Sequence, residues 1–226
     1  MNIEELADRY IAVKEIEKIM SKHTFLHLQL KNREEMETLW CKKTPEPTLT
    51  TNHGTYRGYD EIFAWYVEEF EKRAFTNDCA MQANHEALRQ FNVDELHGVG
   101  TFLVDTFTTP IVELAEDMAT AKGWFCGSAI TTDIVDGAPQ ARWTWKKYGV
   151  DFTLEDGAYK IWHLKMLTEF SIKPGTSWTD GSDELPCGMP PSDTTCQYDF
   201  YSPERVPENN PPIPVPYSTF RETFSY

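Results

Sequence analysis

Basic residues and long apolar segments are both scarce in this sequence. Its 226 residues include 21 Lys and Arg against 36 Asp and Glu, which gives a formal net charge of −15. No Lys/Arg cluster is dense enough to neutralise a phosphate backbone, so the composition excludes a nucleic-acid partner and disfavours an anionic membrane surface. No apolar run reaches the length of a membrane span, and the acidic residues 1–5 lack the pattern of a signal peptide. We therefore expect a cytoplasmic protein with no membrane partner.

Cysteine is also sparse and shows no paired spacing. The five cysteines are scattered and form no C-x-x-C motif: Cys41, Cys79, Cys126, Cys187 and Cys196. This spacing predicts free thiols in a reducing compartment. A disulfide between Cys187 and Cys196 that staples the C-terminal segment is the alternative.

Aromatic residues, in contrast, are abundant, with 7 Trp, 10 Tyr and 13 Phe. Such side chains suit a core or a ligand pocket with flat apolar walls. Apolar residues recur at helical spacing over residues 3–40, with a break at Asn32, and again over residues 61–73. Residues 74–96 fit either another helix or an irregular lid. Strand-like segments follow over residues 97–107, 109–116, 119–132, 139–153 and 158–170. Helices followed by a meander of antiparallel strands predict an α+β fold.

The composition changes after residue 173. Ten of the 14 prolines lie in the last 53 residues, mixed with seven Tyr and Phe. Proline excludes regular strand pairing, whereas a disordered tail rarely carries so many aromatic residues. We expect residues 1–172 to form the α+β domain and residues 173–226 an extended arm that packs on this domain or on a neighbouring subunit. A mobile tail is the alternative. The acidic surface and the aromatic arm favour a homodimer or homotrimer.

The segment 159–165 carries titratable groups on an apolar strand. Strand alternation places Tyr159, Ile161 and His163 on one face, with Trp162 and Leu164 on the other. If the face of His163 lines a pocket, the imidazole is a candidate proton carrier. The alternative is a core histidine that is hydrogen-bonded to a neighbouring strand.

A histidine pair lies on the first predicted helix. The four-residue spacing of His23 and His27 puts both imidazoles on one helix face. This spacing can bind zinc, but the intervening residues lack the glutamate of the zincin motif, and no third ligand is evident. We expect no metal. Either histidine can instead line a ligand pocket or have a structural role.

Asp105 shares the face of its predicted strand with Leu103 and other apolar residues. If this face lines a cavity, burial would raise the pKa of Asp105 and make it a general base or acid near neutral pH. The alternative is that Asp105 lies on the solvated face of the sheet.

The segment 142–152 alternates between two chemically different faces. Trp143, Trp145 and Lys147 share one face, while Arg142 lies on the other. The tryptophans and the lysine would suit an aromatic wall with a cationic end, or a surface under the arm or a subunit interface. Alternation alone does not identify the buried face, and a bulge at Gly149 would exchange the two faces.

Several short motifs together resemble the nuclear transport factor 2-like superfamily, in particular its SnoaL-like branch. They cover about residues 10–170 and are the helical segments 15–20 and 36–40, Gly54-x-Tyr56-x-Gly58-x-Asp60-Glu61-Ile62, residues 109–114 with Asp117-x-Ala119-Thr120-Ala121, and Asp156-Gly157-x-Tyr159-Lys160-Ile161-Trp162. The resemblance implies a cone-shaped curved antiparallel sheet wrapped around the N-terminal helices, with an apolar pocket at its wide end.

The resemblance also implies chemistry. Relatives include scytalone dehydratase, ketosteroid isomerase, bile-acid dehydratases, limonene epoxide hydrolase, polyketide cyclases and lyases acting on lignin-derived diaryl compounds, which mostly work without a cofactor. Many of them use an Asp or Tyr near the end of the first helix and a His on a central strand. In this chain the helix position falls near His27 and Leu28, and the strand position falls near Asp105. The acid–base pair would then be retained, with the His on the helix and the Asp on the strand.

These observations predict a cofactor-independent lyase, dehydratase or isomerase. Its substrate would be a hydrophobic aromatic or polycyclic hydroxylated small molecule, such as a lignin-derived diaryl or steroid-like compound. His27, Asp105 and His163 are the candidate bases. The predicted substrate-binding residues, among them the donors for a developing oxyanion, are His23, Tyr56, Arg142, Trp145 and Lys147. A non-catalytic small-molecule-binding or assembly domain of the same fold is the alternative.

Overall fold

The helices come first in the chain, as the sequence predicts. The computed structural model describes residues 2–183, 188–218 and 226. The helical elements are α1 (Ile3–Leu28), α2 (Asn32–Leu39), α3 (Tyr59–Phe63), the π-helical segment η1 (Ala64–Glu69) and α4 (Phe70–Asn84), followed by the short η2 (Glu86–Leu88), η3 (Val93–Glu95) and η4 (Trp178–Asp180). α3, η1 and α4 run without a break, so the helix predicted over residues 61–73 extends at both ends. No helix in the described part of the chain has the length and apolar character that crossing a bilayer requires.

The start of α1 is fixed by a capping box. The side chain of Asn2 accepts a hydrogen bond from the backbone N–H of Glu5 at 2.9 Å, and the Glu5 carboxylate accepts one from the N–H of Asn2 at 2.8 Å. The buried positions of α1 then recur every three or four residues: Ala12, Ile16, Ile19, Met20, His23 and Leu26. This stripe continues to the last turn, which carries His27.

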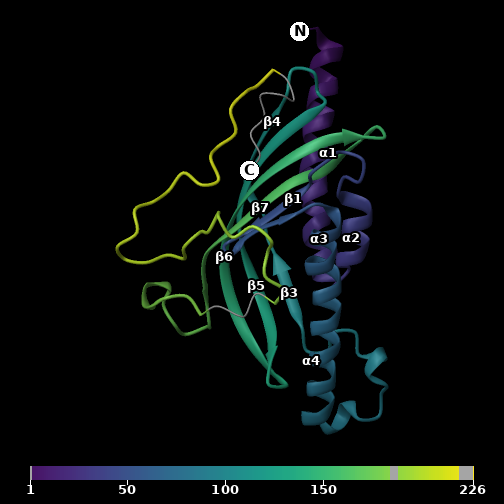
Figure 1. Cartoon of the computed structure of the whole chain (residues 1–226), viewed down its shortest axis with the longest axis vertical. Helices are drawn as coiled ribbons and strands as arrows, with labels where there is room; N and C mark the ends of the chain where they lie inside the picture. The colour runs from purple at the N-terminus through teal and green to yellow at the C-terminus, as the bar shows by residue number, and fades with distance from the viewer. Residues whose placement is uncertain (1, 184–187, 219–225) are drawn as a thin grey trace.

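The strands form one curved sheet in front of the helices (Figure 1). They are β1 (Thr48–Thr51), β2 (Gly54–Arg57), β3 (Phe102–Asp105), β4 (Thr108–Leu114), β5 (Thr120–Val135), β6 (Ala138–Glu155) and β7 (Ala158–Ile172). Their order is β2-β1-β7-β6-β5-β3, and β4 also pairs with β5. All pairings of these strands are antiparallel except that of β1 with β7, which is parallel. The predicted α+β architecture is confirmed.

Two bulges interrupt β7, whereas the pairing of β5 with β6 is regular throughout. Asp151 and Phe152 of β6 pair with His163 and Ile161, so that Trp162 is an extra residue on β7. A second extra residue is Glu169. Each bulge exchanges the two faces of the strand beyond it.

The hydrophobic core lies between the helices and the concave face of the sheet. α1, α2 and the α3–η1 segment contribute Ile16, Met20, Met36 and Ile62, while the sheet contributes Phe125, Tyr148, Val150, Phe152, Ile161 and Leu164. On β6, Tyr148, Val150 and Phe152 therefore mark the concave face.

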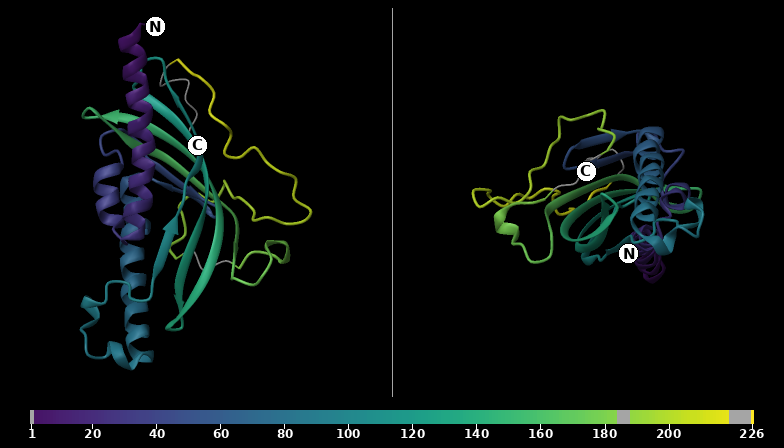
Figure 2. Two further views of the ribbon diagram at one scale, coloured as in Figure 1. Left: turned by 180° about the vertical axis from the view of Figure 1, so that it is seen from behind. Right: turned by 90° about the horizontal axis from the view of Figure 1, so that it is seen from below.

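Much of the segment after β7 lies on the side of the sheet away from the helices (Figure 2). Near residues 188–193 the segment passes the edge at β2, where Met189 O accepts a hydrogen bond from Tyr56 and Ser192 bonds to Glu61 of α3. Its backbone bonds to the domain at several points: Tyr198 N–H to Asn52 O at 3.1 Å, Tyr201 N–H to Glu169 O at 2.7 Å, and Glu116 N–H to Tyr217 O at 3.2 Å. The described part of the predicted arm thus packs on its own domain. The division into residues 1–172 and 173–226, the homodimer or homotrimer, and contact of the arm with a neighbouring subunit stay predictions. Cys196 is a free thiol, and Cys187 lies outside the described residues.

Candidate active site

A pocket of about 170 Å³ opens between the C-terminal end of α1, the η1–α4 segment and the concave face of the sheet. Its apolar wall consists of Trp65, Phe70, Leu103 and Met166. The polar residues lining it are His27, Asn32, Tyr66, Glu69, Arg73, Asp105 and Lys146. An apolar cavity with a few convergent polar groups is the usual form of a small-molecule site.

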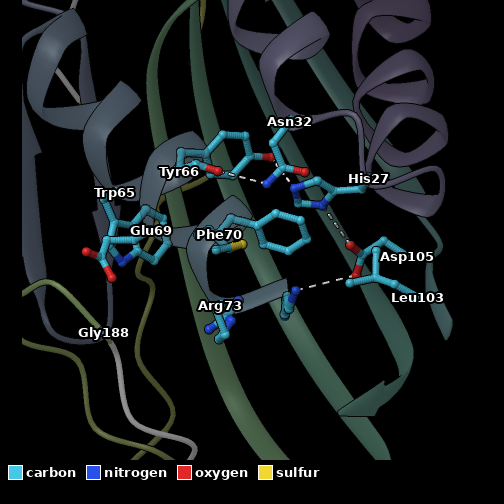
Figure 3. Close-up of a pocket in the computed structure, with 12 residues that line it drawn as sticks. His27, Asn32, Trp65, Tyr66, Glu69, Phe70, Arg73, Leu103, Asp105 and Gly188 are labelled. Carbon is cyan, nitrogen blue, oxygen red and sulfur yellow. Dashed lines mark hydrogen bonds and ion pairs between the residues drawn. The ribbon is translucent and has the colours of Figure 1, made fainter. Parts of the chain in front are cut away.

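His27 and Asp105 meet in this pocket (Figure 3). The last turn of α1 presents His27, and the last residue of β3 is Asp105. His27 Nδ1 lies 3.4 Å from Asp105 Oδ2, and the two side chains are only 13% and 3% exposed. Of the two alternatives for Asp105, the cavity-facing one is therefore correct. The structure thus brings together His27 of the helix and Asp105 of the strand, the two partners of the predicted acid–base pair. Their catalytic roles stay predictions.

The charge state of Asp105 differs from the sequence-based expectation. Burial alone raises its pKa, as expected, but the charge of Lys146 and the hydrogen bond and charge of His27 lower it by more, so the pKa lies below its ordinary value of 3.8. Asp105 is thus an ionised carboxylate at neutral pH. The expectation of a raised pKa was wrong because Lys146 of another strand and His27 of α1 together outweigh burial, and neither is near Asp105 in the sequence.

Lys146 supplies a cationic group beside Asp105. It lies on the concave face of β6, two residues before the buried Tyr148, and its Nζ is 3.4 Å from Asp105 Oδ1. An ammonium group has three donors, so Lys146 can contact Asp105 and still donate to a bound molecule.

Tyr66 approaches His27 from the other side. The wide turn of η1 carries Tyr66, and its backbone carbonyl accepts a hydrogen bond from the Asn32 side chain at 2.9 Å. π-helical turns often occur at functional sites. The Tyr66 hydroxyl contacts His27 Nε2 and lies 2.9 Å from the Glu35 carboxylate. Burial, together with the charge of Glu35, holds the pKa of Tyr66 well above 10, so it stays a phenol.

Behind the pocket, the buried Glu35 of α2 joins Tyr66 to His23. Its other oxygen lies 2.6 Å from His23 Nδ1. Burial raises the pKa of Glu35, but the charge and hydrogen bond of His23 outweigh burial and lower it. For His23, burial lowers the pKa, and Glu35 raises it above the ordinary value.

The same group could hold a metal ion. Ligand atoms of His23, His27 and Glu35 lie within 4.8 Å of one another, so Glu35 is the third ligand that the sequence did not reveal. Two imidazoles and a carboxylate are a donor set that suits Zn²⁺. The expectation that the protein binds no metal stays a prediction.

The structure corrects the placement of His163. Because of the bulge at Trp162, Ile161 and Leu164 both enter the core, and His163 lies beside Asp151 on the convex face. Its Nδ1 is 2.8 Å from Asp151 Oδ2, and its Nε2 is 3.2 Å from Glu46 O. The alternative of a buried histidine that is hydrogen-bonded to a neighbouring strand is therefore the correct one.

Trp145 and Lys147 do not line the pocket as substrate-binding residues, and for Lys147 the alternative of a surface under the arm is correct. Both alternate with Lys146 on β6, so they face away from the pocket. Lys147 Nζ pairs with Glu169 at 2.5 Å, beneath the arm, where Tyr198 also contacts Glu169. The bulge considered at Gly149 is absent from β6, and the bulges between β6 and β7 lie on β7.

Tyr56 and Arg142 lie near the pocket without lining it. Tyr56 stacks on Trp65 with ring centroids 4.6 Å apart and donates to Met189 O, which holds Trp65 against the cavity from behind. Arg142 lines an adjoining pocket of about 280 Å³ that shares Trp65, Arg73, Lys146 and Met166 with the first. Tyr56 can therefore affect a bound molecule only through Trp65, and Arg142 lines the adjoining pocket rather than the pocket of His27. His23 lies behind the pocket rather than in its lining.

Three central residues were missed from the sequence. Lys146 lies on the same face of its predicted strand as Arg142, and alternation alone did not show that this face is the buried one. Tyr66 belongs to the apolar stripe of residues 61–73, and that pattern predicts a core residue rather than a site residue. For Glu35 no sequence signal stands out, because a glutamate on a short polar helix is usually exposed.

Comparisons with known proteins bear on the fold. No protein-family model matches the chain, and no curated protein matches it in sequence. A putative scytalone dehydratase from Novosphingobium aromaticivorans superposes with a TM-score of 0.50 at 12% identity, over 75% of this chain and 91% of the other. Two hexachlorocyclohexane dehydrochlorinase structures, LinA Type2 and LinA, give TM-scores of 0.51 at 12% and 13% identity, over 80% of this chain and 97% and 98% of theirs. At these identities the likeness concerns the fold, and the chain has the cone-shaped fold of the nuclear transport factor 2-like, SnoaL-type proteins.

Proposed function

We propose that this protein is a lyase that removes water, or a comparable leaving group, from a hydrophobic small molecule by acid–base chemistry and without a cofactor. The observation that carries the proposal is the 3.4 Å contact of His27 with the ionised Asp105 in an apolar pocket that also presents Lys146. Structures that share the fold are named as a dehydratase and a dehydrochlorinase, and both names denote eliminations.

His27 is the base in this proposal. The Tyr66 hydroxyl donates to Glu35, so its oxygen accepts the Nε2–H of a neutral His27 and the lone pair lies on Nδ1. The 3.4 Å contact with Asp105 exceeds the usual N–H···O range, so this lone pair remains reachable from the pocket. When Nδ1 takes a proton from a carbon of the substrate, the carboxylate of Asp105 stabilises the imidazolium that forms. An ionised, low-pKa Asp105 is itself a weak base, which favours His27 for the proton transfer.

Lys146 stabilises the developing negative charge, and Tyr66 holds the imidazole ring of His27 in place. Removal of the proton leaves an enolate on a carbonyl-bearing substrate, and the ammonium group of Lys146 stabilises it. The electron pair then forms the carbon–carbon double bond and expels the hydroxyl, which takes the proton from the imidazolium and departs as water. Tyr66, held as a phenol, keeps its contact with Nε2 and fixes the ring on the side opposite Asp105.

A screen with a defined variant tests this function. Aryl-substituted β-hydroxy carbonyl compounds are incubated with the protein in D₂O, and NMR and mass spectrometry detect the unsaturated product. We expect turnover with the wild type and a loss of about 10²- to 10⁴-fold in rate for His27→Gln. Asp105→Asn should lower kcat as well, because the imidazolium loses its counter-charge. His85→Gln, a substitution of an exposed histidine at the end of α4, is the matched control and should behave as wild type.

Unchanged turnover in His27→Gln, or in Asp105→Asn, would exclude the proposed base pair. Tight binding of a screened compound without any conversion would instead support the non-catalytic binding domain. Isomerisation without loss of a leaving group would retain His27 as the base and replace elimination by proton transfer.

A further inference from the structure

Arg73 occupies a central position among the cavities of this protein. It lines the pocket of His27, the adjoining pocket of Arg142 and a third pocket of about 530 Å³. The third pocket shares Glu69, Phe70 and Leu103 with the first and extends along α4 toward the end of β5. The Arg73 side chain therefore lies at the junction of the three pockets, among the residues that line the pocket of His27 (Figure 3).

Within the described part of the chain, Arg73 has no acidic partner. Each carboxylate lining the first two pockets already pairs with a cation: Glu69 with Lys72 at 3.3 Å, Asp105 with Lys146 at 3.4 Å and Asp133 with Arg142 at 3.0 Å. Among the described residues, the contact of Arg73 is with the ring of Phe70, at 5.6 Å, and no carboxylate lies in ion-pair range. Arg73 is exposed and lines the pocket, so its charge is available to a molecule that binds there.

The geometry points to an anionic ligand. We propose that Arg73 binds the carboxylate of the substrate, so that the substrate class is a hydrophobic carboxylic acid whose apolar body packs on Trp65, Phe70 and Met166. A planar guanidinium matches a carboxylate with two parallel hydrogen bonds, and the ring of Phe70 favours the orientation of the charged group. The proposal deepens the proposed function and rests on it for the choice of pocket, but its test measures binding and needs no turnover.

The experiment compares one apolar body with and without a charge. 2-Naphthoate, methyl 2-naphthoate and 2-naphthamide are titrated into the full-length protein by isothermal titration calorimetry. We expect the acid to bind more tightly than the two neutral probes, by roughly 10- to 100-fold, as for a charge-assisted hydrogen bond. Arg73→Gln should raise the Kd of the acid by the same factor and leave the neutral probes unchanged. Arg73→Lys, which keeps the charge and loses the fork, should lie between wild type and Arg73→Gln.

The matched control is Arg33→Gln, which removes an exposed arginine that already pairs with Glu71 at 2.8 Å. It should leave every Kd unchanged. Equal affinity of the acid and the ester, an equal effect of Arg73→Gln on both, or no binding of the acid at about 1 mM would overturn the proposal. His27→Gln should lose turnover and still bind the acid, which separates a failure of this proposal from a failure of the proposed function.

Discussion

The buried ion cluster on the convex face should be essential for stability rather than for chemistry. Asp151 accepts contacts from Lys122 Nζ at 2.6 Å, from His163 Nδ1 at 2.8 Å and from the backbone N–H of Tyr226 at 3.2 Å. The side chains of Lys122 and Asp151 are only 10% and 2% exposed. Asp151→Asn keeps the shape and removes the charge, so a buried ammonium loses its counter-charge.

Loss of one partner of a buried ion pair costs about 3–5 kcal/mol. For a chain of this length, about 1 kcal/mol shifts the melting temperature by roughly 2–4 °C, so we expect Asp151→Asn to melt about 6–20 °C below wild type. Differential scanning calorimetry and urea unfolding measure the change. Asp156→Asn is the matched control, because it makes the same substitution in a pair with Lys43 whose side chains are both 68% exposed. It should melt with the wild type.

A melting temperature of Asp151→Asn within about 2 °C of wild type would refute this reasoning, since the cluster would then contribute no more than a surface pair. The same variant also distinguishes the two interpretations of His163. If His163 acts in catalysis, Asp151→Asn should change the rate constant of the folded enzyme; we expect the rate constant to stay at the wild-type level.

Three further predictions follow from the site and the arm. The free energy of unfolding should be greatest between pH 4.5 and 6.5. On the acid side, Asp105 and Glu35 have lowered pKa values, so the stability they give is lost as the pH falls below their ordinary values of 3.8 and 4.5. On the alkaline side, His23 has a raised pKa, so the stability it gives is lost as the pH rises above 6.5. Thermal scans across pH test this, and Glu35→Gln should flatten the alkaline side. Elemental analysis should find no stoichiometric zinc, because Glu35 is already hydrogen-bonded by His23 and Tyr66; zinc that is lost in Glu35→Gln would contradict this. Truncation after residue 175 should lower the melting temperature, since Asn52 loses its bonds to Tyr198, and light scattering should show a lower oligomeric mass; an unchanged mass would exclude an arm that links subunits.

Much of the fold follows from periodicity in the sequence. The stripe of α1 and the alternation on β5 and β6 are local patterns, so the order of elements could be anticipated. The position of Asp105 opposite the end of α1 was implied by the resemblance to a known family, because alternation alone left the face of Asp105 open. The break between α1 and α2 was also predicted at Asn32, whose side chain donates a hydrogen bond to the carbonyl of Tyr66.

The assignments that failed depended on contacts between distant segments. Alternation along β6 separates Lys146 from Lys147 but does not say which face the helices cover. The bulge at Trp162 has no signature in the sequence, because the extra residue is set by pairing with Asp151 and Phe152. The pKa of Asp105 likewise depends on Lys146, which is 41 residues away in the chain.

The two bulges of β7 also determine which sequence changes this strand can absorb in evolution. Deletion of Trp162 would leave Ile161 and His163 as neighbours opposite Phe152 and Asp151, so the strand would pair regularly and each remaining side chain would keep its face. A homologue without the bulge must therefore be aligned with a one-residue gap at this point. In an ungapped alignment, its pocket residues would be matched to the wrong face of the sheet.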